Sequence, residues 1–376
     1  MLFALLLERQ KYLIYPVILS KHLMLLLSID GKMTDQKEIK CVVWDLDNTL
    51  WDGVLIEGDD VRLKPGVIDV IKTLDHRGIL HSIASKNHYD DAIQKLREFK
   101  IDDFFLYPEI GWNAKSQSIA TIHEKLNIGM DTFLFIDDEP YERDEVKSEH
   151  PDITCIESSK YLELPSYPSL NPRFITKDSK KRRLMYLQDQ QRKQDEKNYK
   201  GPRKEFLASL DIHLSIHEAV KEDLKRAEEL TVRTNQLNAT GKTFSYDELK
   251  KYMTSKRYRL IVCELNNRYG SYGNIGLALV EVLKEYYHIN LLLMSCRVMS
   301  MGVGTILLTH IMQEAGKDSK KVKADFRHTG RNRMMYVTFK FAGFREVITD
   351  GNGTIVMEND LDTIQEFPPH IAITIQ

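Results

Sequence analysis

The chain has 376 residues, 42% of them hydrophobic, and a formal net charge of −2 at pH 7. This length exceeds the usual size of a single domain, and a net charge near zero gives no overall field that favours nucleic acid or acidic membranes. The four cysteines (Cys41, Cys155, Cys263 and Cys296) form no Cys-x-x-Cys pair, so neither a zinc site nor a disulfide framework is indicated. We therefore expect a two-domain protein of the reducing cytoplasm.

Residues 1–35 form an N-terminal extension that fits neither domain. Their apolar stretches are broken by charged residues and by Pro16, which makes them too short to predict a membrane span. No small-residue cleavage site indicates a secretory signal. Because Met33 lies just before the first expected strand, we interpret residues 1–32 as the result of an upstream start. The alternative is a peripheral helix packed on the first domain.

Two carboxylates follow the first expected strand. Residues 41–44 are an apolar run typical of a buried strand, and Asp45, Asp47 and Thr49 come next. In an open α/β sheet, ligands bind at the carboxyl ends of the strands. One carboxylate can attack phosphorus while the other handles the proton, with Mg²⁺ between them. A polar turn after a strand is the alternative, but three further groups in order argue against it.

These further groups come after later expected elements. Ser85 and Asn87 come after a second apolar strand, and their hydroxyl and amide can hold phosphate oxygens. Lys115 opens a helix, where its charge can neutralise a phosphate. Another strand runs into Asp137 and Asp138, whose carboxylates suit Mg²⁺. The spacing leaves open which of these two aspartates binds the metal.

Strand and helix patterns alternate over residues 36–160, which predicts a doubly wound parallel sheet. With the motifs above, this segment resembles the haloacid dehalogenase (HAD) superfamily of phosphotransferases. The resemblance implies that Asp45 is the nucleophile, that Asp47 is the general acid/base, and that Ser85 and Lys115 bind phosphate. It also implies a Mg²⁺ site drawn from Asp45, Asp47, Asp137 and Asp138. The short gap after Thr49 predicts no large cap domain, and hence an open site that admits a bulky or protein-borne substrate.

Residues 161–204 are interpreted as a charged linker. Prolines indicate irregular chain at its start, and the basic residues 180–183 then lead into Gln- and Lys-rich sequence. We expect a solvated connecting helix here. Docking of an acidic partner on the basic residues is the alternative.

The second domain, residues 205–376, has a different order of elements. We expect a helix over 224–237, strands over 259–265, 275–283 and 287–298, a helix over 305–315, a strand over 321–326 and a helix from 332. Gly302 and Gly304 lie just before a helix N-terminus, where free amides can cradle a phosphate. This order resembles the Gcn5-related (GNAT) acyltransferases and implies a mixed sheet. Met299 stands where that family's loop usually has Gln or Arg, so a phosphopantetheine arm is the alternative ligand to coenzyme A.

Cys296 lies near the end of the longest expected strand, just before the glycine loop. The neighbouring Arg297 and the following helix favour a thiolate, which can accept an acyl group and pass it on. The alternative is a buried structural cysteine, which is our interpretation of Cys263.

The remaining polar candidates carry weaker signals. Asn235 and Asn238 would share one helical face and bind the acyl or pantetheine chain, or else be helix-end residues. His328 is the candidate base for the thiol, against a solvated surface histidine. Asn332 is a candidate helix N-cap.

The combination of the two domains resembles the FkbH-like glyceryl transferase/phosphatase family over residues 38–346. The segments that carry this resemblance are 42–55, 135–146, 233–238, 268–273 and 294–299. It implies that Cys296 takes a glyceryl unit from 1,3-bisphosphoglycerate and loads it on an acyl carrier protein, for a methoxymalonyl-type polyketide extender unit. Two alternatives stay open: a Mg²⁺-dependent phosphatase of another small metabolite with a docking domain, and a non-enzymatic scaffold for carrier proteins.

Overall fold

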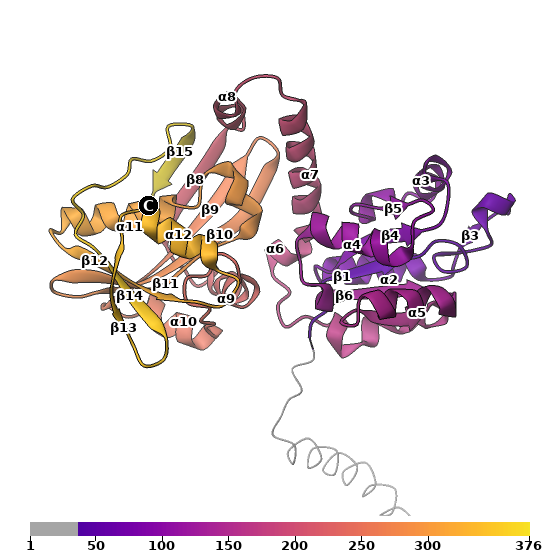
Figure 1. The fold of residues 1–376 in the computed structure, drawn as a ribbon, viewed down its shortest axis with the longest axis horizontal. Helices are drawn as coiled ribbons and strands as arrows, with labels where there is room; N and C mark the ends of the chain where they lie inside the picture. The colour runs from indigo at the N-terminus through magenta and orange to yellow at the C-terminus, as the bar shows by residue number, and fades with distance from the viewer. Residues whose placement is uncertain (1–36) are drawn as a thin grey trace, which may run out of the picture.

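The computed structural model of the chain describes residues 37–376 and places them in two α/β domains connected through helix α7 (Arg182–Asn198) (Figure 1). The interpretation of residues 1–35, including a start at Met33, falls on residues outside this range. None of the helices within residues 37–376 combines the length and the apolar character needed to cross a membrane.

The first domain is built on a five-stranded parallel sheet with strand order β5-β4-β1-β6-β7. Its strands are β1 (Cys41–Trp44), β4 (Leu80–Ser85), β5 (Glu109–Ile110), β6 (Phe133–Asp137) and β7 (Thr154–Glu157). Its helices are α2 (Val67–His76), α3 (Tyr89–Glu98), α4 (Lys115–Leu126) and α5 (Pro140–Glu149), with 3-10 turns η2 (Asp102–Phe104) and η3 (Met130–Thr132). Alternate residues of β1 enter two separate cores, Val42 and Trp44 one and Cys41 and Val43 the other. The predicted doubly wound sheet, covered on both faces, is therefore confirmed.

Little chain separates the two aspartates after β1 from α2. This segment forms only the two-residue strands β2 (Trp51–Asp52) and β3 (Arg62–Leu63) with the 3-10 turn η1 (Leu55–Glu57) between them. The expected absence of a large cap over this part of the described chain agrees with this arrangement.

The second domain contains an eight-stranded mixed sheet in the order β13-β14-β12-β11-β10-β9-β8-β15. Its strands are β8 (Ile212–Glu218), β9 (Tyr258–Asn267), β10 (Gly270–Val282), β11 (Tyr286–Met294), β12 (Lys321–Arg327), β13 (Arg345–Thr349), β14 (Thr354–Asn359) and β15 (Ile371–Ile375). Its helices are α9 (Leu224–Arg233), α10 (Tyr246–Met253), η6 (Cys296–Met301), α11 (Ile306–Lys317) and α12 (Arg333–Phe341). The expected fold class, a parallel α/β domain followed by a mixed-sheet α/β domain, is confirmed.

Several elements of the second domain differ from the expectation. Strand β11 ends at Met294, so that Cys296 begins the 3-10 turn η6 instead of ending a strand. Helix α9 ends at Arg233, four residues earlier than predicted. Strands β8, β13, β14 and β15 and helix α10 were not predicted. Of these, β8 alternates buried and exposed residues and could have been found from its period of two.

Strands β11 and β12 pair in parallel over only four residues, Tyr286–Ile289 with Lys321–Ala324, and then diverge. The segment that comes after α9 fills the gap between them. The Ala239 N–H donates to the Leu292 carbonyl of β11 at 2.9 Å, and the Ala239 carbonyl accepts from the Arg327 N–H of β12 at 3.0 Å. The chain thus closes the space between the two strands with its own backbone.

The region between the domains is less solvated than a charged linker would be. It contains η4 (Ser158–Ser166), η5 (Pro168–Leu170), α6 (Lys177–Lys180), α7 and α8 (Arg203–Ala208). Arg182 donates to the Gly78 carbonyl at 2.6 Å, Arg183 pairs with Asp75 at 2.9 Å, and Arg192 is 1% exposed. The expected connecting helix is present as α7, but it is less solvated than predicted because Arg182 and Arg183 bind the first domain and Arg192 binds its own helix.

One buried carboxylate connects the linker to the second domain. Glu229 of α9 is fully buried and binds Arg182 at 2.5 Å, Arg226 at 2.9 Å and Arg233 at 3.4 Å, and it accepts from the Thr176 hydroxyl at 2.8 Å. Burial opposes its ionisation, but the guanidinium groups of Arg226, Arg182 and Arg233 prevail and keep the pKa of Glu229 below its ordinary value.

We expect Glu229→Gln to lower the free energy of unfolding by about 3–5 kcal/mol, because it leaves guanidinium groups around a buried neutral side chain. Denaturant unfolding followed by circular dichroism measures this. The neighbouring Glu228→Gln is the matched control, since Glu228 pairs with Arg173, whose side chain is 64% exposed. Equal losses of unfolding free energy in the two variants would contradict a central role for Glu229.

A second prediction concerns His81 in β4, which is fully buried. The Trp44 indole N–H donates to its Nδ1 at 3.0 Å, and its Nε2 lies 3.2 Å from the Ile71 carbonyl, so the ring is neutral with the proton on Nε2. Burial lowers the pKa of His81 to about 3.

Because the pKa of His81 is depressed on folding, its neutral form contributes stability that is fully present above the unfolded value near 6.5. That contribution is lost as the pH falls from 6.5 toward 3, by at most about 1.4 kcal/mol per pH unit. Urea unfolding followed by tryptophan fluorescence measures it, since Trp44, Trp51 and Trp112 all lie in the first domain. We expect His81→Gln to flatten this slope and the exposed His76→Gln to leave it unchanged.

Candidate functional site

Three acidic side chains meet at the carboxyl ends of β1 and β6. Single oxygen atoms of Asp45, Asp137 and Asp138 all lie within 4.8 Å of one another. Asp45 follows β1, and Asp137 is the last residue of the neighbouring β6, so the parallel pairing of the two strands brings them together. Carboxylate oxygens are the ligands that Mg²⁺ prefers, so this donor set fits the ion expected from the sequence.

Lys115 neutralises part of this charge from the N-terminus of α4. Its Nζ lies 2.6 Å from Oδ1 of Asp45 and 2.5 Å from Oδ2 of Asp137. Burial raises the pKa of Asp45 to about 6, Lys115 opposes that rise, and Asp137 adds to it. The Glu139 N–H holds the other Asp137 oxygen at 2.8 Å. The predicted lysine and two predicted acids therefore form one buried cluster.

Thr49 and Asp138 bind each other reciprocally. The Thr49 hydroxyl donates to Oδ1 of Asp138 at 3.2 Å and accepts from the Asp138 N–H at 3.1 Å. Asp137 and Asp138 thus both belong to the cluster, but Asp137 is held by Lys115 and Asp138 by Thr49. The sequence left open which of the two aspartates binds the metal, and the structure places both in the cluster with different partners.

Asp47 is held apart from the three clustered acids. Its Oδ1 accepts from the Trp51 indole N–H at 2.8 Å and from the Leu55 N–H at 3.0 Å, and its Oδ2 accepts from the Asn87 amide at 2.9 Å. The predicted Asn87 therefore orients a carboxylate. Neutral donors on both oxygens fix the direction of Asp47 without an ion pair.

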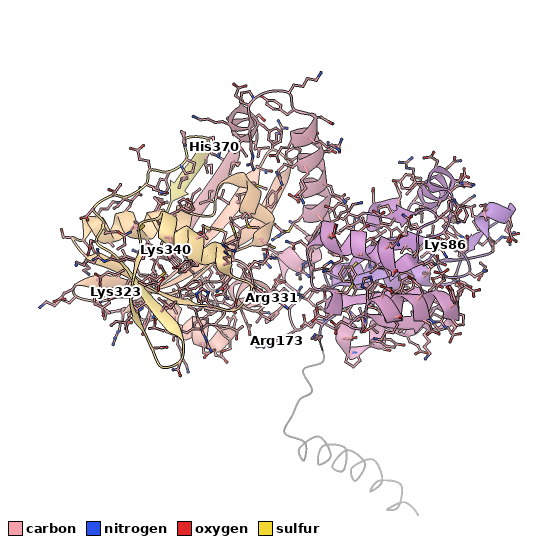
Figure 2. All side chains as sticks on the ribbon, in the orientation of Figure 1. Lys86, Arg173, Lys323, Arg331, Lys340 and His370 are labelled. Carbon is pink, nitrogen blue, oxygen red and sulfur yellow. The ribbon has the colours of Figure 1, made fainter. Side chains whose placement is uncertain are left out.

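Ser85 and Lys86 complete this edge of the sheet. Ser85 ends β4 and is 4% exposed. Lys86, which was not singled out from the sequence, pairs with Glu142 at 2.6 Å. In Figure 2, Lys86 lies at the end of the first domain that is farther from the second domain.

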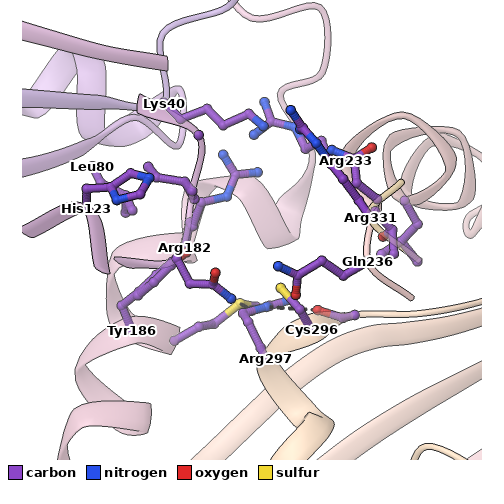
Figure 3. Close-up of a pocket in the computed structure, with 18 of the residues that line it drawn as sticks. Lys40, Leu80, His123, Arg182, Tyr186, Arg233, Gln236, Cys296, Arg297 and Arg331 are labelled. Atoms are coloured by element: carbon purple, nitrogen blue, oxygen red, sulfur yellow. Dashed lines mark hydrogen bonds between the residues drawn. The ribbon is translucent and has the colours of Figure 1, made fainter. Parts of the chain in front are cut away.

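A cavity of about 690 Å³ lies between the two domains. The predicted Asn235, Cys296 and Arg297 line it from the second domain, and Lys40 and His123 from the first. Figure 3 shows Lys40 reaching into it opposite Arg233 and Arg331. The sequence does not predict that these residues lie together, because they belong to separate segments that come close only when the two domains pack.

Cys296 differs from the other three cysteines in its exposure. Cys41 and Cys263 are buried and Cys155 is half-buried, whereas Cys296 is exposed. Burial raises the pKa of the Cys263 thiol to about 12 and that of Cys155 to about 11. The core assignment of Cys263 is confirmed, and the alternative of a buried structural cysteine at position 296 is wrong.

Arg297 follows Cys296 in the chain, and several contacts hold its guanidinium in place. Its guanidinium lies 3.3 Å from the Ser295 hydroxyl and 3.4 Å from the Tyr272 carbonyl, and it also contacts the Met185 sulfur. Burial and then the nearby Arg226 lower the pKa of Arg297.

Other predicted residues of the second domain do not join the cavity. Asn238 is buried and braces the chain between β11 and β12, and the Asn332 amide donates to the Asn238, Ala239 and Arg327 carbonyls. Asn332 occupies the N-cap position of α12 as predicted, but its side chain makes no cap hydrogen bond there. Asn235 and Asn238 share no helical face because α9 ends before them.

His328 and the glycine loop also lie apart from Cys296. His328 packs edge-on against Phe326 at 4.8 Å and does not line the cavity. Gly302 and Gly304 precede α11 as predicted, with Gly302 at φ +76°, but they do not line the cavity either. A phosphate cradle at this loop stays a prediction, separate from the cysteine.

The cavity and the acidic cluster lie at opposite edges of the parallel sheet. Lys40 immediately precedes β1 and Asp45 immediately follows it, so their Cα atoms are about 16 Å apart at about 3.3 Å per residue. The starts of β4, β6 and β7 also contribute lining residues, namely Leu80, Asp131 and Asp152. The two sites therefore do not share one cavity.

Comparison with known proteins relates the first domain to phosphatases. The human protein magnesium-dependent phosphatase 1 is 31% identical over 136 residues, which cover 31% of this chain and 76% of that protein. No family model matches the chain. The N-terminal part of a Bacteroides fragilis protein, containing a phosphatase domain complexed with Mg, is 30% identical, with a TM-score of 0.33. That match covers 42% of this chain and 45% of the other.

The second domain is matched by a different set of solved structures. The ribosomal-protein-S18-alanine N-acetyltransferase of Escherichia coli is 17% identical, with a TM-score of 0.31. The match covers 39% of this chain and 92% of that one. The GNAT domain of a Streptomyces lividans protein is 13% identical with a TM-score of 0.32, covering 39% of this chain and 89% of that one.

We expect Mg²⁺ to raise the stability of the first domain by about 2.7 kcal/mol at a hundredfold excess over its Kd. Asp137→Asn and Asp138→Asn should each weaken this effect, because each removes one carboxylate of the cluster. Thermal unfolding followed by tryptophan fluorescence, with and without Mg²⁺, measures it. Asp52→Asn, an exposed acid nearby, is the control, and an undiminished Mg²⁺ shift in Asp137→Asn would contradict the ligand set.

Proposed function

Because the chain belongs, through its N-terminal domain, to the family of magnesium-dependent phosphatase 1, we propose that it couples this Mg²⁺-dependent, HAD-type phosphatase to acyl transfer by its second domain. The proposed reaction moves a glyceryl unit from 1,3-bisphosphoglycerate to a phosphopantetheinylated acyl carrier protein and removes the phosphate on C3. The product would serve as a polyketide extender unit of the methoxymalonyl type.

The phosphatase step is assigned to residues at the carboxyl ends of β1 and β6. Lys115 holds Oδ1 of Asp45, which leaves Oδ2 to attack the phosphorus of the C3 ester and form an aspartyl phosphate. Asp47, held in direction by Asn87 and Trp51, donates a proton to the leaving C3 oxygen and then takes one from the hydrolytic water. Mg²⁺ at the three clustered acids supplies the positive charge that offsets the phosphate charge.

The acyl-transfer step is assigned to Cys296. Its thiolate attacks C1 of the acyl phosphate, the bond from C1 to the phosphate oxygen breaks, and inorganic phosphate leaves. The glyceryl group is then a thioester on Sγ. The thiol of the carrier arm attacks the same carbon and displaces Cys296, which takes up the proton. No ATP is required, because the acyl phosphate is already activated.

The observation that supports this assignment most is the place of Cys296. Of the four cysteines, Cys296 is the one that is exposed, and it lines an interdomain cavity that also contains cationic side chains. A substrate with two phosphates fits such a cavity by charge. If the second domain served only for docking, there would be no functional reason for an exposed cysteine beside these cations.

A second candidate is a phosphatase of another small phosphorylated metabolite, with the second domain used for docking. The separation of the acidic cluster from the cavity favours it, because the phosphatase needs nothing from the other edge of the sheet. It predicts phosphate release without any transfer to a carrier.

Intact mass spectrometry of a phosphopantetheinylated carrier protein tests the proposal. The carrier would be incubated with this enzyme, Mg²⁺ and 1,3-bisphosphoglycerate formed in place. A gain equal to a glyceryl or phosphoglyceryl group supports transfer. Phosphate release with no gain on the carrier supports the second candidate.

We expect Cys296→Ala to abolish carrier loading while phosphatase activity on a simple phosphate ester stays within about twofold. Asp45→Asn should abolish the phosphatase activity, because the proposed attack on phosphorus requires its free carboxylate oxygen. Cys155→Ala is the matched control for loss of a thiol and should retain both activities. Loading that persists in Cys296→Ala would remove the covalent step.

A further inference from the structure

The cavity beside Cys296 contains more positive than negative charge. The cations that line it are Lys37, Lys40, Arg182, Arg226, Arg233, Arg297 and Arg331, and the acids that line it are Asp131, Asp152 and Asp178. Most of this positive charge is balanced by nearby carboxylates. Glu229 binds Arg182, Arg226 and Arg233. Arg226 also pairs with Asp178 at 3.0 Å, Arg233 with Glu38 at 3.3 Å and Lys37 with Asp131 at 2.6 Å.

Three of the cations lack such balance. Within residues 37–376, no carboxylate lies at ion-pair distance from Lys40, Arg297 or Arg331. Arg297 is occupied by Ser295 and Tyr272. Lys40 and Arg331 therefore remain as cations that face the cavity from opposite domains (Figure 3).

Their placement carries a cost that an anion would remove. Burial lowers the pKa of Lys40 and the positive charges of Arg233 and Arg182 lower it further, while the carboxylates of Glu38 and Asp131 only partly oppose the shift. The positive charges of Lys40 and Arg331, on opposite domains, repel each other across a partly desolvated space. A phosphoryl group accepts several charge-assisted hydrogen bonds and can bind more than one cationic side chain.

We propose that Lys40 and Arg331 form an interdomain site for a phosphoryl group carried by the molecule that reacts at Cys296. This inference rests on the proposed acyl transfer and names the anchor that holds the reactant. The phosphoryl group can come from two sources: the distal phosphate of the acyl donor, or the phosphodiester end of the pantetheine arm.

The packing of the second domain also indicates that a reactant reaches Cys296 through this cavity. The gap between β11 and β12 is closed by Leu237 and Ala239, which bond to β11 and β12, and by the buried Asn332 amide. An acyl or pantetheine chain therefore does not pass between these strands. Entry from the interdomain side brings the chain past Lys40 and Arg331 on its way to the thiol.

The test measures protection of Cys296 and needs no turnover. The enzyme would carry Asp45→Asn, which prevents hydrolysis of the probe, and Cys155→Ala, which removes the half-buried thiol. The rate of alkylation of Cys296 by iodoacetamide is followed by intact mass. The probes are 3-phosphoglycerate against glycerate, and S-methylated 4′-phosphopantetheine against S-methylated pantetheine, whose blocked thiols do not consume iodoacetamide.

We expect at least one phosphorylated probe to slow alkylation at concentrations where its unphosphorylated partner does not. Lys40→Met and Arg331→Met should each raise the concentration for half protection about tenfold. Lys340→Met, an exposed lysine on α12 outside the cavity, is the matched control and should leave it unchanged. Tryptophan fluorescence unfolding checks that Lys40→Met folds, and the probe pair that protects identifies the source of the phosphate.

Two results would overturn the inference. One is equal protection by phosphorylated and unphosphorylated probes, or none by any. The other is protection that survives in both Lys40→Met and Arg331→Met. Failure of carrier loading is a separate outcome: if 3-phosphoglycerate still protects Cys296 through Lys40 and Arg331, the anion site stands and the glyceryl transfer does not. If the carrier is loaded but phosphate gives no protection, only the anion site falls.

Discussion

The arrangement of the two domains depends on Glu229. A single buried carboxylate with three arginines around it lies where α9 meets the linker, and Arg182 extends the contact to the Gly78 carbonyl of the first domain. Gly78 has φ +79°, and a Cβ there would lie 2.5 Å from the Ser179 carbonyl oxygen, so only glycine permits this approach. Since a buried charge must be paired, the contacts of Glu229 with Arg182 and Thr176 hold the linker against α9.

This constraint gives the molecule its second site. The interdomain cavity is lined by the starts of β1, β4, β6 and β7 on one side and by Cys296 and Arg331 on the other. Neither side encloses the cavity by itself, whereas the acidic cluster is complete in the first domain. A phosphatase could keep its activity without the second domain, but the chemistry proposed at Cys296 requires the packing that Glu229 fixes.

Local order in the sequence was sufficient to predict the acidic cluster but not the contacts between distant segments. Asp45, Lys115 and Asp137 were predictable because each ends or opens an element of a parallel sheet, and such ends share an edge. The roles of Lys40 and Arg182 were not, since a lysine before a strand and an arginine in a basic run look like ordinary solvated residues.

The side-chain contacts of Asn238 and Asn332 were missed for a related reason. Their side chains bind backbone groups between β11 and β12, and no periodic pattern reveals that the two strands diverge. His328 was chosen for its charged neighbours in the sequence, but it packs on Phe326, away from the cavity that contains the cysteine.

The opposite positions of the two sites have an electrostatic reason. The phosphatase cluster contains three carboxylates, which suit a cation, while the cavity at Cys296 contains the cations Lys40 and Arg331, to which we assign an anion. Placed together, the carboxylates would pair with Lys40 and Arg331 and leave these cations unavailable to an anion. Separated by the length of β1, about 16 Å between the Cα atoms of Lys40 and Asp45, the carboxylates are too far away to pair with the cations of the cavity. Each site therefore keeps its own charged groups, and the proposed carrier arm, which is mobile, is a suitable way to serve both.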